Sequence, residues 1–362
     1  MKAWPLLVVL GCIYLTYSLE EGKDLKPVKW TGGLTKMDDG RKVNNGISTR
    51  AQLHDDFAFL CNPRIKPGME ATLLKRCMFP KDGELCMEPF PPGKPQTEGD
   101  CECLQSAVDV YLDSEDTLWV LDVGLTYASH SQTAPKCPPK VLGINIHTGK
   151  IENVINLANM VGPMSRLQFI VADHTSQNNR YLYVSDAGTK TIIVWDVAKK
   201  KGVRVALPEK VVREYAPLDV LYLALIRRQT GNNLLYFTYR SGDDLFCIES
   251  KHLQEDASTS KAWNVGKKPS KLIFLGTDDW ESIYFRYEPK ADVYKWNTSE
   301  PFTENNFELV HRANTSLIST HAMPDYKRLI MRIVESNLYS YLGSNAKPAE
   351  SENSLTVMSI TP

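Results

Sequence analysis

The sequence predicts an all-β fold, a six-bladed β-propeller, and two observations support this prediction. A short apolar run that ends in an aspartate or an aromatic residue, followed by a turn and a second apolar run, recurs along the 362 residues. The copies open at Leu53, Thr117, Tyr181, Leu234, Ser282 and Arg328, about 64, 64, 53, 48 and 46 residues apart. This spacing is close to the ~40–50 residues that a four-stranded propeller blade requires. A pair of β-sandwiches would also contain short strands, but without a blade-length period.

Each copy has the length and composition of a β-strand. Thr117–Asp122 (TLWVLD) and Tyr181–Asp186 (YLYVSD) are rich in β-branched and aromatic residues. Second apolar runs, such as Val141–Ile146 and Thr191–Asp196, follow after turn residues and indicate hairpins. The run Leu355–Ile360 is expected to be a last strand that completes a blade built from another part of the chain as well, because closing the ring removes exposed sheet edges.

Residues 1–18 are predicted to be a secretory signal peptide. Lys2 precedes an apolar stretch from Trp4 to Tyr17, with small residues at its end. This stretch is shorter than the ~20 residues that cross a bilayer, which disfavours a membrane anchor. We expect residues 19–362 to form a single propeller domain of a secreted, extracellular protein, because no linker rich in Ser, Pro or Gly divides them.

Cysteine usage agrees with export. In an oxidising compartment, disulfides are expected among six of the seven cysteines that follow the predicted signal peptide, Cys61, Cys77, Cys86, Cys101, Cys103 and Cys137, with a connectivity that the sequence leaves open. The seventh, Cys247, lies in an apolar run and is expected to be a buried free thiol; an intermolecular cross-link is the alternative. The pair Cys101-Glu-Cys103 lacks a partner motif with ligand spacing, so no metal site is expected there.

Several other classes of partner and modification can be judged from the sequence. Asn297 and Asn314 each open an N-glycosylation sequon in a polar stretch. The formal net charge is −1 and the lysines are scattered, so nucleic acid is not an expected partner. The chain contains no Gly-x-Ser-x-Gly elbow, zinc-type His pair or phosphate loop, and no cofactor is expected.

Longer phrases carry a family resemblance. They are residues 103–113 (CLQSAVDVYLD), 118–124 (LWVLDVG), 137–145 (CPPKVLGIN), 181–188 (YLYVSDAG) and 193–196 (IVWD). The chain resembles the insect yellow and major royal jelly proteins, which are secreted six-bladed propellers. Residues 30–33, 185–188 and 275–278 are most similar to the yellow-g branch, whose members are associated with the ovary and the eggshell.

The resemblance implies a role. It implies a non-enzymatic extracellular-matrix protein, a structural component of the insect eggshell that helps to form or harden the vitelline membrane and chorion. Its partners would then be other eggshell proteins, and exposed tyrosines would offer sites for oxidative cross-linking. The alternative that the family offers is a protein of the melanin pathway that binds a biogenic amine or catecholamine, or converts dopachrome, in its central channel.

The inner strands of a propeller line its channel, so polar residues at their ends are candidate ligands. These residues are Asp122, Asp186, Tyr239, Thr277, Asp278, Thr320, Glu335 and Asn337. Amine-binding relatives imply that Thr320, Asn337 and Tyr339 contact a small aromatic amine, with Asp122 able to face its ammonium group. Ser185-Asp186 departs from the Thr-Asn pair that is frequent in the family at this place, which argues against a transferred amine site. The alternative for the whole set of polar residues is that their side chains only cap strands and bridge blades.

Calcium binding and acid–base catalysis are two further possibilities for the channel. Calcium would need about six to eight oxygen ligands, and nothing in the spacing of the acidic residues demands such a site. The seven histidines are scattered singly. Among them, His321 is the candidate acid or base, because it follows Thr320 directly.

Overall fold

The computed structural model describes residues 28–30, 46–66, 69–80, 86–94, 96–126, 137–175, 179–212, 218–229, 232–313, 317–343 and 355–360. The predicted signal peptide and the second sequon, at Asn314, lie outside these residues. No helix among the described residues is both long enough and apolar enough to span a membrane.

The described strands form four-stranded antiparallel sheets. The first sheet contains β2 (Arg50–His54), β3 (Phe57–Cys61), β4 (Leu73–Cys77) and β5 (Met87–Pro89). The second contains β6 (Ala107–Leu112), β7 (Thr117–Asp122), β8 (Lys140–Asn145) and β9 (Ile151–Asn156). The third contains β10 (Leu167–His174), β11 (Arg180–Asp186), β12 (Thr191–Asp196) and β13 (Lys201–Ala206).

The fourth sheet contains β14 (Leu221–Ile226), β15 (Leu234–Tyr239), β16 (Asp244–Glu249) and β17 (Trp263–Lys267). The fifth contains β18 (Leu272–Thr277), β19 (Ser282–Tyr287), β20 (Val293–Asn297) and β21 (Phe307–His311). The sixth contains β22 (Ile318–Asp325), β23 (Ile330–Ser336), β24 (Leu355–Ile360) and β1 (Val28–Trp30). Short helices are α1 (Glu209–Val212), α2 (Ser250–Glu255), α3 (Leu338–Leu342), η2 (Ala158–Met160) and η3 (Glu304–Asn306).

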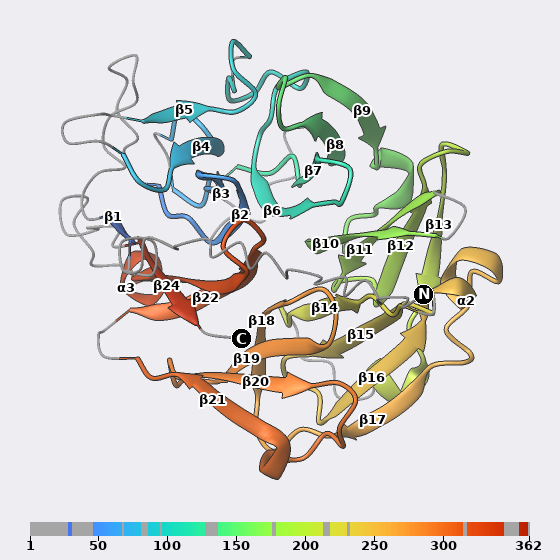
Figure 1. Ribbon diagram of the computed structural model, residues 1–362. Helices are drawn as coiled ribbons and strands as arrows, with labels where there is room; N and C mark the ends of the chain where they lie inside the picture. Colours follow the sequence, from blue (N-terminus) through green and yellow to red (C-terminus); the bar gives the residue numbers. More distant parts are fainter. Residues whose placement is uncertain are drawn as a thin grey trace, which may run out of the picture.

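The sheets are arranged around a common centre, with β2, β6, β10, β14, β18 and β22 innermost (Figure 1). Each of these inner strands contacts the inner strands of both neighbouring sheets, so the ring is closed. The predicted all-β propeller is therefore confirmed. Five sheets use strands that are consecutive along the chain, and the sixth joins the two ends of the described chain.

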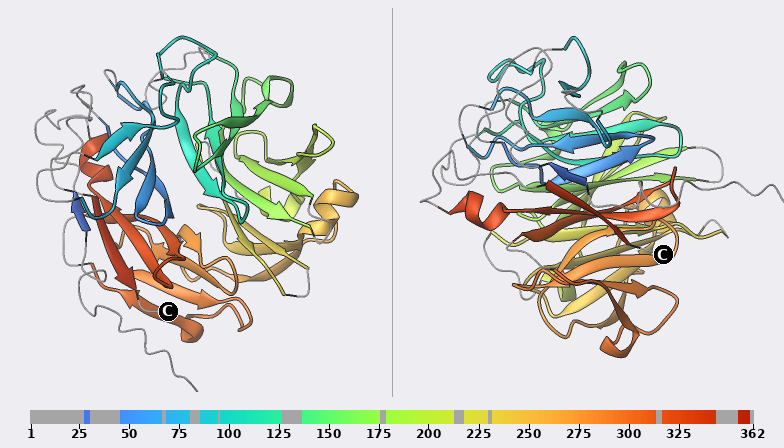
Figure 2. Two further views of the ribbon diagram at one scale, coloured as in Figure 1. Left: turned by 45° about the horizontal axis from the view of Figure 1, so that its top comes forward. Right: turned by 60° about the vertical axis from the view of Figure 1, so that its left-hand side comes forward.

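The closing sheet has the composite origin that the sequence predicted. β24 pairs with β23 on one side, and β1 pairs with β24 on the other. Figure 2 shows dark blue β1 lying beside the red strands of the chain's end. β24 lies between β1 and β23 and is hydrogen-bonded to both, so it connects the two ends of the ring. β23 is in turn paired with β22 and β24, and neither of its edges is open.

The repeated sequence phrase marks the second strand of each blade. Its copies fall on β7, β11, β15, β19 and β23, and the looser first copy spans the end of β2 and β3. These strands lie inside their sheets and are covered on both faces by neighbouring blades, which explains their continuous apolar character. Trp119, Leu182 and Phe237, from three successive blades, belong to one apolar cluster and are at most 1% exposed.

The disulfide prediction is confirmed for four of its six cysteines. Cys77 pairs with Cys86, and Cys101 pairs with Cys137. The prediction was wrong for Cys61 and Cys103, which are free thiols. Cys61 ends β3 inside the apolar core, 0% exposed, and the Cys103 thiol donates a hydrogen bond to the Asp100 carboxylate at 3.3 Å.

The remaining cysteine and the described sequon have simple environments. Cys247 on β16 is a buried free thiol, as predicted, and burial raises its pKa well above the usual value. Asn297 is the last residue of β20, and its side-chain oxygen accepts a hydrogen bond from the Ser299 hydroxyl at 2.6 Å. This sequon therefore lies at the start of a turn, where a glycan can project into solvent.

Candidate functional site in the central channel

A cavity occupies the axis of the ring. It is lined by residues of all six inner strands and of the turns that follow them. Its volume is about 60 Å³, measured as the space open to the centres of water molecules. One water needs about 10–15 Å³ by this measure and about 30 Å³ of liquid, so the cavity could hold about four to six waters. That corresponds to about 120–180 Å³ of molecular volume, which suits a small ring compound.

Aromatic rings form one wall of the cavity. Phe169 on β10 lies 5.3 Å from Tyr222 on β14, and Tyr222 lies 5.7 Å from Phe274 on β18, measured between ring centroids. The three rings come from three successive blades because each inner strand turns alternate side chains to the axis. A flat, unsaturated ligand would find dispersion contacts on this side.

A charged pair faces this wall. Nε of Arg50, at the start of β2, lies 3.7 Å from Oδ1 of Asp109 on β6, and the guanidinium carbon lies 4.7 Å from the Phe169 ring centroid. Arg50 also donates a hydrogen bond to the Leu275 carbonyl at 3.2 Å. The guanidinium group is thus held by contacts to three other blades.

Asp109 has an unusual environment for a carboxyl group. Its side chain is nearly buried, and burial raises its pKa to about 6, although Arg50 and the backbone N–H of Ile170 both favour the charged form. The Ile170 N–H donates to Oδ2 at 2.9 Å, which fixes the orientation of the carboxyl group. A carboxyl group with such a pKa can both accept and return a proton near neutral pH.

His321 on β22 completes this end of the cavity. Its Nδ1 accepts a hydrogen bond from the backbone N–H of Ala51 at 3.2 Å, so the proton of the neutral ring is assigned to Nε2. Burial lowers the pKa of His321 well below its usual value, and the positive charge of Arg50 acts in the same direction. His321 is therefore neutral, with its Nε2–H free to act as a donor, and the acid or base role expected of it from the sequence stays a prediction.

A second polar cluster closes the other end of the cavity. The Asp279 carboxylate accepts hydrogen bonds from the hydroxyls of Tyr111, at 3.0 Å, and Tyr326, and pairs with the Arg227 guanidinium at 3.2 Å. Asp279, Arg227 and Tyr326 lie in turns that follow inner strands, and the backbone of Asp279 has a positive φ of 73°. Tyr326 remains half exposed, so it lies at a mouth of the channel.

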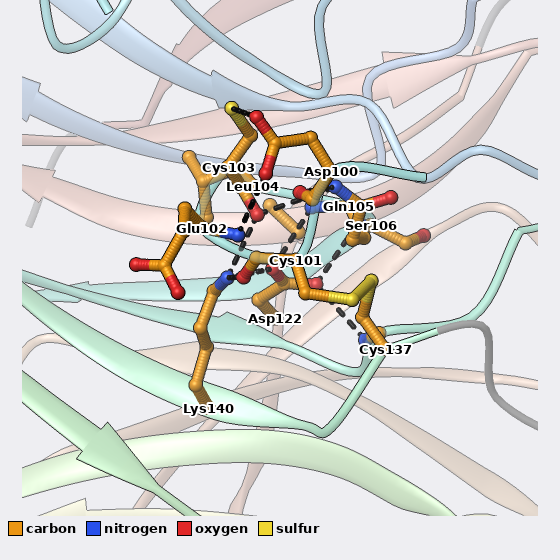
Figure 3. A network of polar contacts seen from close by, with 12 residues as sticks. Asp100, Cys101, Glu102, Cys103, Leu104, Gln105, Ser106, Asp122, Cys137 and Lys140 are labelled. Atoms are coloured by element: carbon orange, nitrogen blue, oxygen red, sulfur yellow. Dashed lines mark hydrogen bonds and ion pairs between the residues drawn. A yellow bond between two sulfur atoms is a disulfide. The ribbon is translucent and has the colours of Figure 1, made fainter. Parts of the chain in front are cut away.

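The predicted aspartates are structural. Asp122 is fully buried and accepts hydrogen bonds from the backbone N–H groups of Gln105 at 2.9 Å and Ser106 at 2.8 Å, which places the start of β6 (Figure 3). In the same network Lys140 donates to the carbonyls of Cys101 and Cys103. Asp186 plays the equivalent role one blade later, accepting from the Arg166 N–H at 2.7 Å. Neither aspartate lines the cavity.

The predicted amine ligands lie outside the cavity as well. The Thr320 hydroxyl donates weakly to the Val334 carbonyl at 3.4 Å, Asn337 directly precedes α3, and the Tyr339 hydroxyl accepts from Arg286 at 3.4 Å. Asn337 has a buried side-chain oxygen without a hydrogen-bond partner, and Tyr339 is 47% exposed. Amine binding by these three residues stays a prediction.

The other predicted polar residues have mixed fates. Thr277 lines the cavity, whereas Tyr239 donates to the Ala187 carbonyl at 2.9 Å and Glu335 pairs with His311 at 2.9 Å. Asp278 accepts hydrogen bonds from the backbone of its own turn, including the Ser282 N–H at 2.9 Å.

Sequence reasoning missed Arg50 and Asp109. A signal was present for Asp109, because it is the one charged residue in the strand Ala107–Leu112 and a buried strand of that kind rarely carries an unpaired charge. Arg50 is likewise a charged residue at the start of a strand. An expected ion pair between Arg50 and Asp109, on neighbouring blades, would have pointed to the channel.

Comparison with known proteins decides the family. A family model described as major royal jelly protein matches residues 105–360, more than half of the chain. The chain belongs to the major royal jelly protein family. Among curated members and relatives, it is 26% identical over 305 residues to dopaminechrome tautomerase of Drosophila melanogaster, covering 75% of this chain and 65% of that protein.

A second curated relative is major royal jelly protein 1 of Apis mellifera, 27% identical over 122 residues, covering 32% of this chain and 27% of that protein. The chain spans less than two thirds of the length of these two relatives. An auxiliary nutrient binding protein from Bacteroides thetaiotaomicron is similar in structure, with a TM-score of 0.50, 10% identity, and coverage of 93% of this chain and 72% of that one. At this identity the likeness concerns the fold alone.

Proposed function

We propose that the central channel binds a small, flat, quinone-type molecule and catalyses a proton transfer within it, as a tautomerase does. The observation that carries this proposal is the carboxyl group of Asp109, whose pKa burial raises to about 6, beside Arg50 and opposite an aromatic wall. The similarity to dopaminechrome tautomerase supports an aminochrome as the substrate class.

The geometry suggests the step. The ionised carboxylate of Asp109 accepts a proton from a saturated ring carbon that is conjugated with a quinone carbonyl. The C–H electron pair then shifts through the conjugated double bonds, and the carbonyl oxygen gains the negative charge. The Arg50 guanidinium and the Nε2–H of His321 can stabilise that oxygen, because both line the same small cavity. Delivery of the proton to that oxygen completes one tautomeric shift, and a second shift of the same kind converts an aminochrome into a dihydroxyindole, so no oxidant or cofactor is needed.

The test is a kinetic assay with dopaminechrome, followed by its absorbance. Asp109→Asn should lower kcat by about 10²–10⁴-fold, the usual contribution of a positioned general base. The matched control is Glu308→Gln, a carboxyl-to-amide change at an exposed partner of Lys295 that should leave the rate unchanged. Equal rates for the native protein and Asp109→Asn would disprove the proposed base.

The pH profile gives an independent check of the same group. Because the base must be ionised, kcat/KM should rise with pH and level off above about pH 6. Saturable binding of dopaminechrome without turnover at any pH would rule out the catalytic step. The protein would then be a carrier of such molecules.

As a second function we propose a structural role in the extracellular matrix of the insect eggshell, with other eggshell proteins as partners. The pairs Cys77–Cys86 and Cys101–Cys137 support export, since disulfides persist in oxidising compartments. The yellow-g-like phrases support the tissue, and the partly exposed rings of Tyr326 and Tyr339 are available for cross-linking.

A loss-of-function animal separates the two proposals. Loss of pigment with a sound, impermeable shell would support the channel chemistry, whereas a collapsed or permeable shell with normal pigment would support the matrix role. Peptide mapping of mature shell should then find dityrosine that involves this chain, and its absence would remove the cross-linking part.

A further inference from the structure

Two histidines and an aspartate from two adjacent blades meet outside the channel. His54 ends β2, Asp116 lies in the turn between β6 and β7, and His147 lies in the turn after β8. One ligand atom from each of the three residues lies within 4.8 Å of the other two. Among the described residues, this is the one group of His, Cys, Asp or Glu side chains that satisfies this spacing.

The atoms face one another closely. His147 Nε2 lies 2.8 Å from Asp116 Oδ2, and His54 Nδ1 lies 3.8 Å from Asp116 Oδ1. The two imidazole rings meet edge to face, with 5.1 Å between centroids. The side chains are 26%, 45% and 55% exposed for His54, Asp116 and His147, so an ion could reach them from solvent.

Hydrogen bonds fix the backbone that carries Asp116 and His147. The Asp116 N–H donates to the Asp113 carbonyl at 3.2 Å, and the Asp116 carbonyl accepts from the Ile146 N–H at 3.1 Å. The His147 N–H donates to the Asn145 side-chain oxygen at 3.1 Å. The turns of Asp116 and His147 are therefore hydrogen-bonded to each other, which keeps the two ligands in place.

A second carboxylate lies near the other ring nitrogen of His54, within ion-pair distance. Its Nδ1 points toward Asp116, and its Nε2 lies 3.5 Å from the carboxylate of Asp55. A carboxylate on the second ring nitrogen sets the tautomer and strengthens the first nitrogen as a ligand. The position of Asp55 is thus a second observation in favour of a metal site, separate from the spacing of His54, Asp116 and His147.

We propose that His54, Asp116 and His147 bind one divalent transition-metal ion of the Zn²⁺ or Cu²⁺ type, with water as a further ligand. Two imidazoles and one carboxylate suit such ions, whereas Ca²⁺ and Mg²⁺ prefer sites made of oxygen alone. Ligand atoms at about 2.0–2.2 Å from a tetrahedral ion lie about 3.4 Å apart. The present separations bracket that value, and rotation of exposed side chains can adjust them.

The ion would connect the first two blades. His54 belongs to the first sheet, while Asp116 and His147 belong to the second. The other reading of the cluster is a set of ion pairs between Asp116 and protonated histidines, which would hold the same side chains together without a metal. Metal binding itself distinguishes the two readings.

The test is calorimetric titration of the full, chelator-treated protein with ZnCl₂ at neutral pH. We expect saturable binding of one ion per chain, at least about 100-fold weaker binding in His147→Ala, and about 10–100-fold weaker binding in Asp55→Asn. CaCl₂ and MgCl₂ should give no comparable binding. The matched control is His252→Ala, which removes a histidine on α2, near Asp256 and away from the three ligands, and should leave the affinity unchanged.

Thermal unfolding provides a second readout. Zn²⁺ should raise the unfolding temperature of the native protein and of His252→Ala, but not of His147→Ala, because only an intact site stabilises the folded state by mass action. Absence of one-site binding, or unchanged affinity in a folded His147→Ala, would overturn the proposal.

Discussion

At the scale of single residues, the channel contains a conflict between burial and charge. Asp109 loses hydration inside the ring, and its pKa rises to about 6 because the nearby Arg50 and the Ile170 N–H offset only part of that loss. A residue chosen for stability alone would not carry a charge there. Such a departure from the pattern of a buried strand is typical of functional sites.

This conflict predicts how stability depends on pH. The folded pKa of Asp109 lies above its unfolded value of about 3.8, so its favourable contribution is present in acid and is lost as pH rises through about 6. Relative to Asp109→Asn, the native protein should lose roughly 2–3 kcal/mol of unfolding free energy between pH 4 and 7. Urea denaturation of both proteins across this range measures the difference. The same slope in both proteins would show that Asp109 does not titrate as proposed.

At the scale of strands and turns, Gly124 explains why the phrase LWVLDVG ends in glycine. Its backbone has a positive φ of 68°, and a Cβ atom there would lie 2.0 Å from the Cys137 carbonyl oxygen. The Cys137 N–H also donates to the Gly124 carbonyl at 3.2 Å. The glycine therefore allows the chain after β7 to approach the segment that enters β8, next to the Cys101–Cys137 disulfide.

Gly124→Ala should consequently be strongly destabilising. The strained φ costs about 1 kcal/mol and the backbone clash adds to it, for a total of roughly 2–4 kcal/mol in chemical denaturation. The control is Gly162→Ala, where no atom lies within 4 Å of the added Cβ and φ is not positive. A loss below about 0.5 kcal/mol in both variants would contradict the close approach.

At the scale of the whole molecule, the ring depends on one composite sheet. Val357 of β24 is paired with Val334 of β23 and with Val28 of β1. The strand joins residues from the two ends of the chain, and without it the last blade would have two strands and an open edge.

Val357→Pro should open the ring. A proline in a strand that is paired on both sides removes a ladder hydrogen bond and costs about 3 kcal/mol or more. We expect a lower unfolding temperature and a larger hydrodynamic radius, measured by circular dichroism and by size-exclusion chromatography. Deleting only residues 361–362, beyond β24, is the control. An unchanged melting curve in Val357→Pro would mean that the ring closes by another route.

The sequence by itself determined the repeat, one strand of each blade and the closing role of Leu355–Ile360, because strand length, apolar content and period are local properties. That this strand is the second of its blade, and not the inner one, was decided by the tertiary structure. The tertiary structure decided which polar residues share a site. Ala51 and His321 are 270 residues apart, yet they are hydrogen-bonded across the ring closure. Asp122 and Asp186 end strands as the sequence showed, but their carboxylates accept hydrogen bonds from backbone N–H groups of the segments that lead into β6 and β10, while Arg50 and Asp109 face the axis. Which side of a strand meets the channel depends on strand twist and register against neighbouring blades, and these are set only when the ring is assembled.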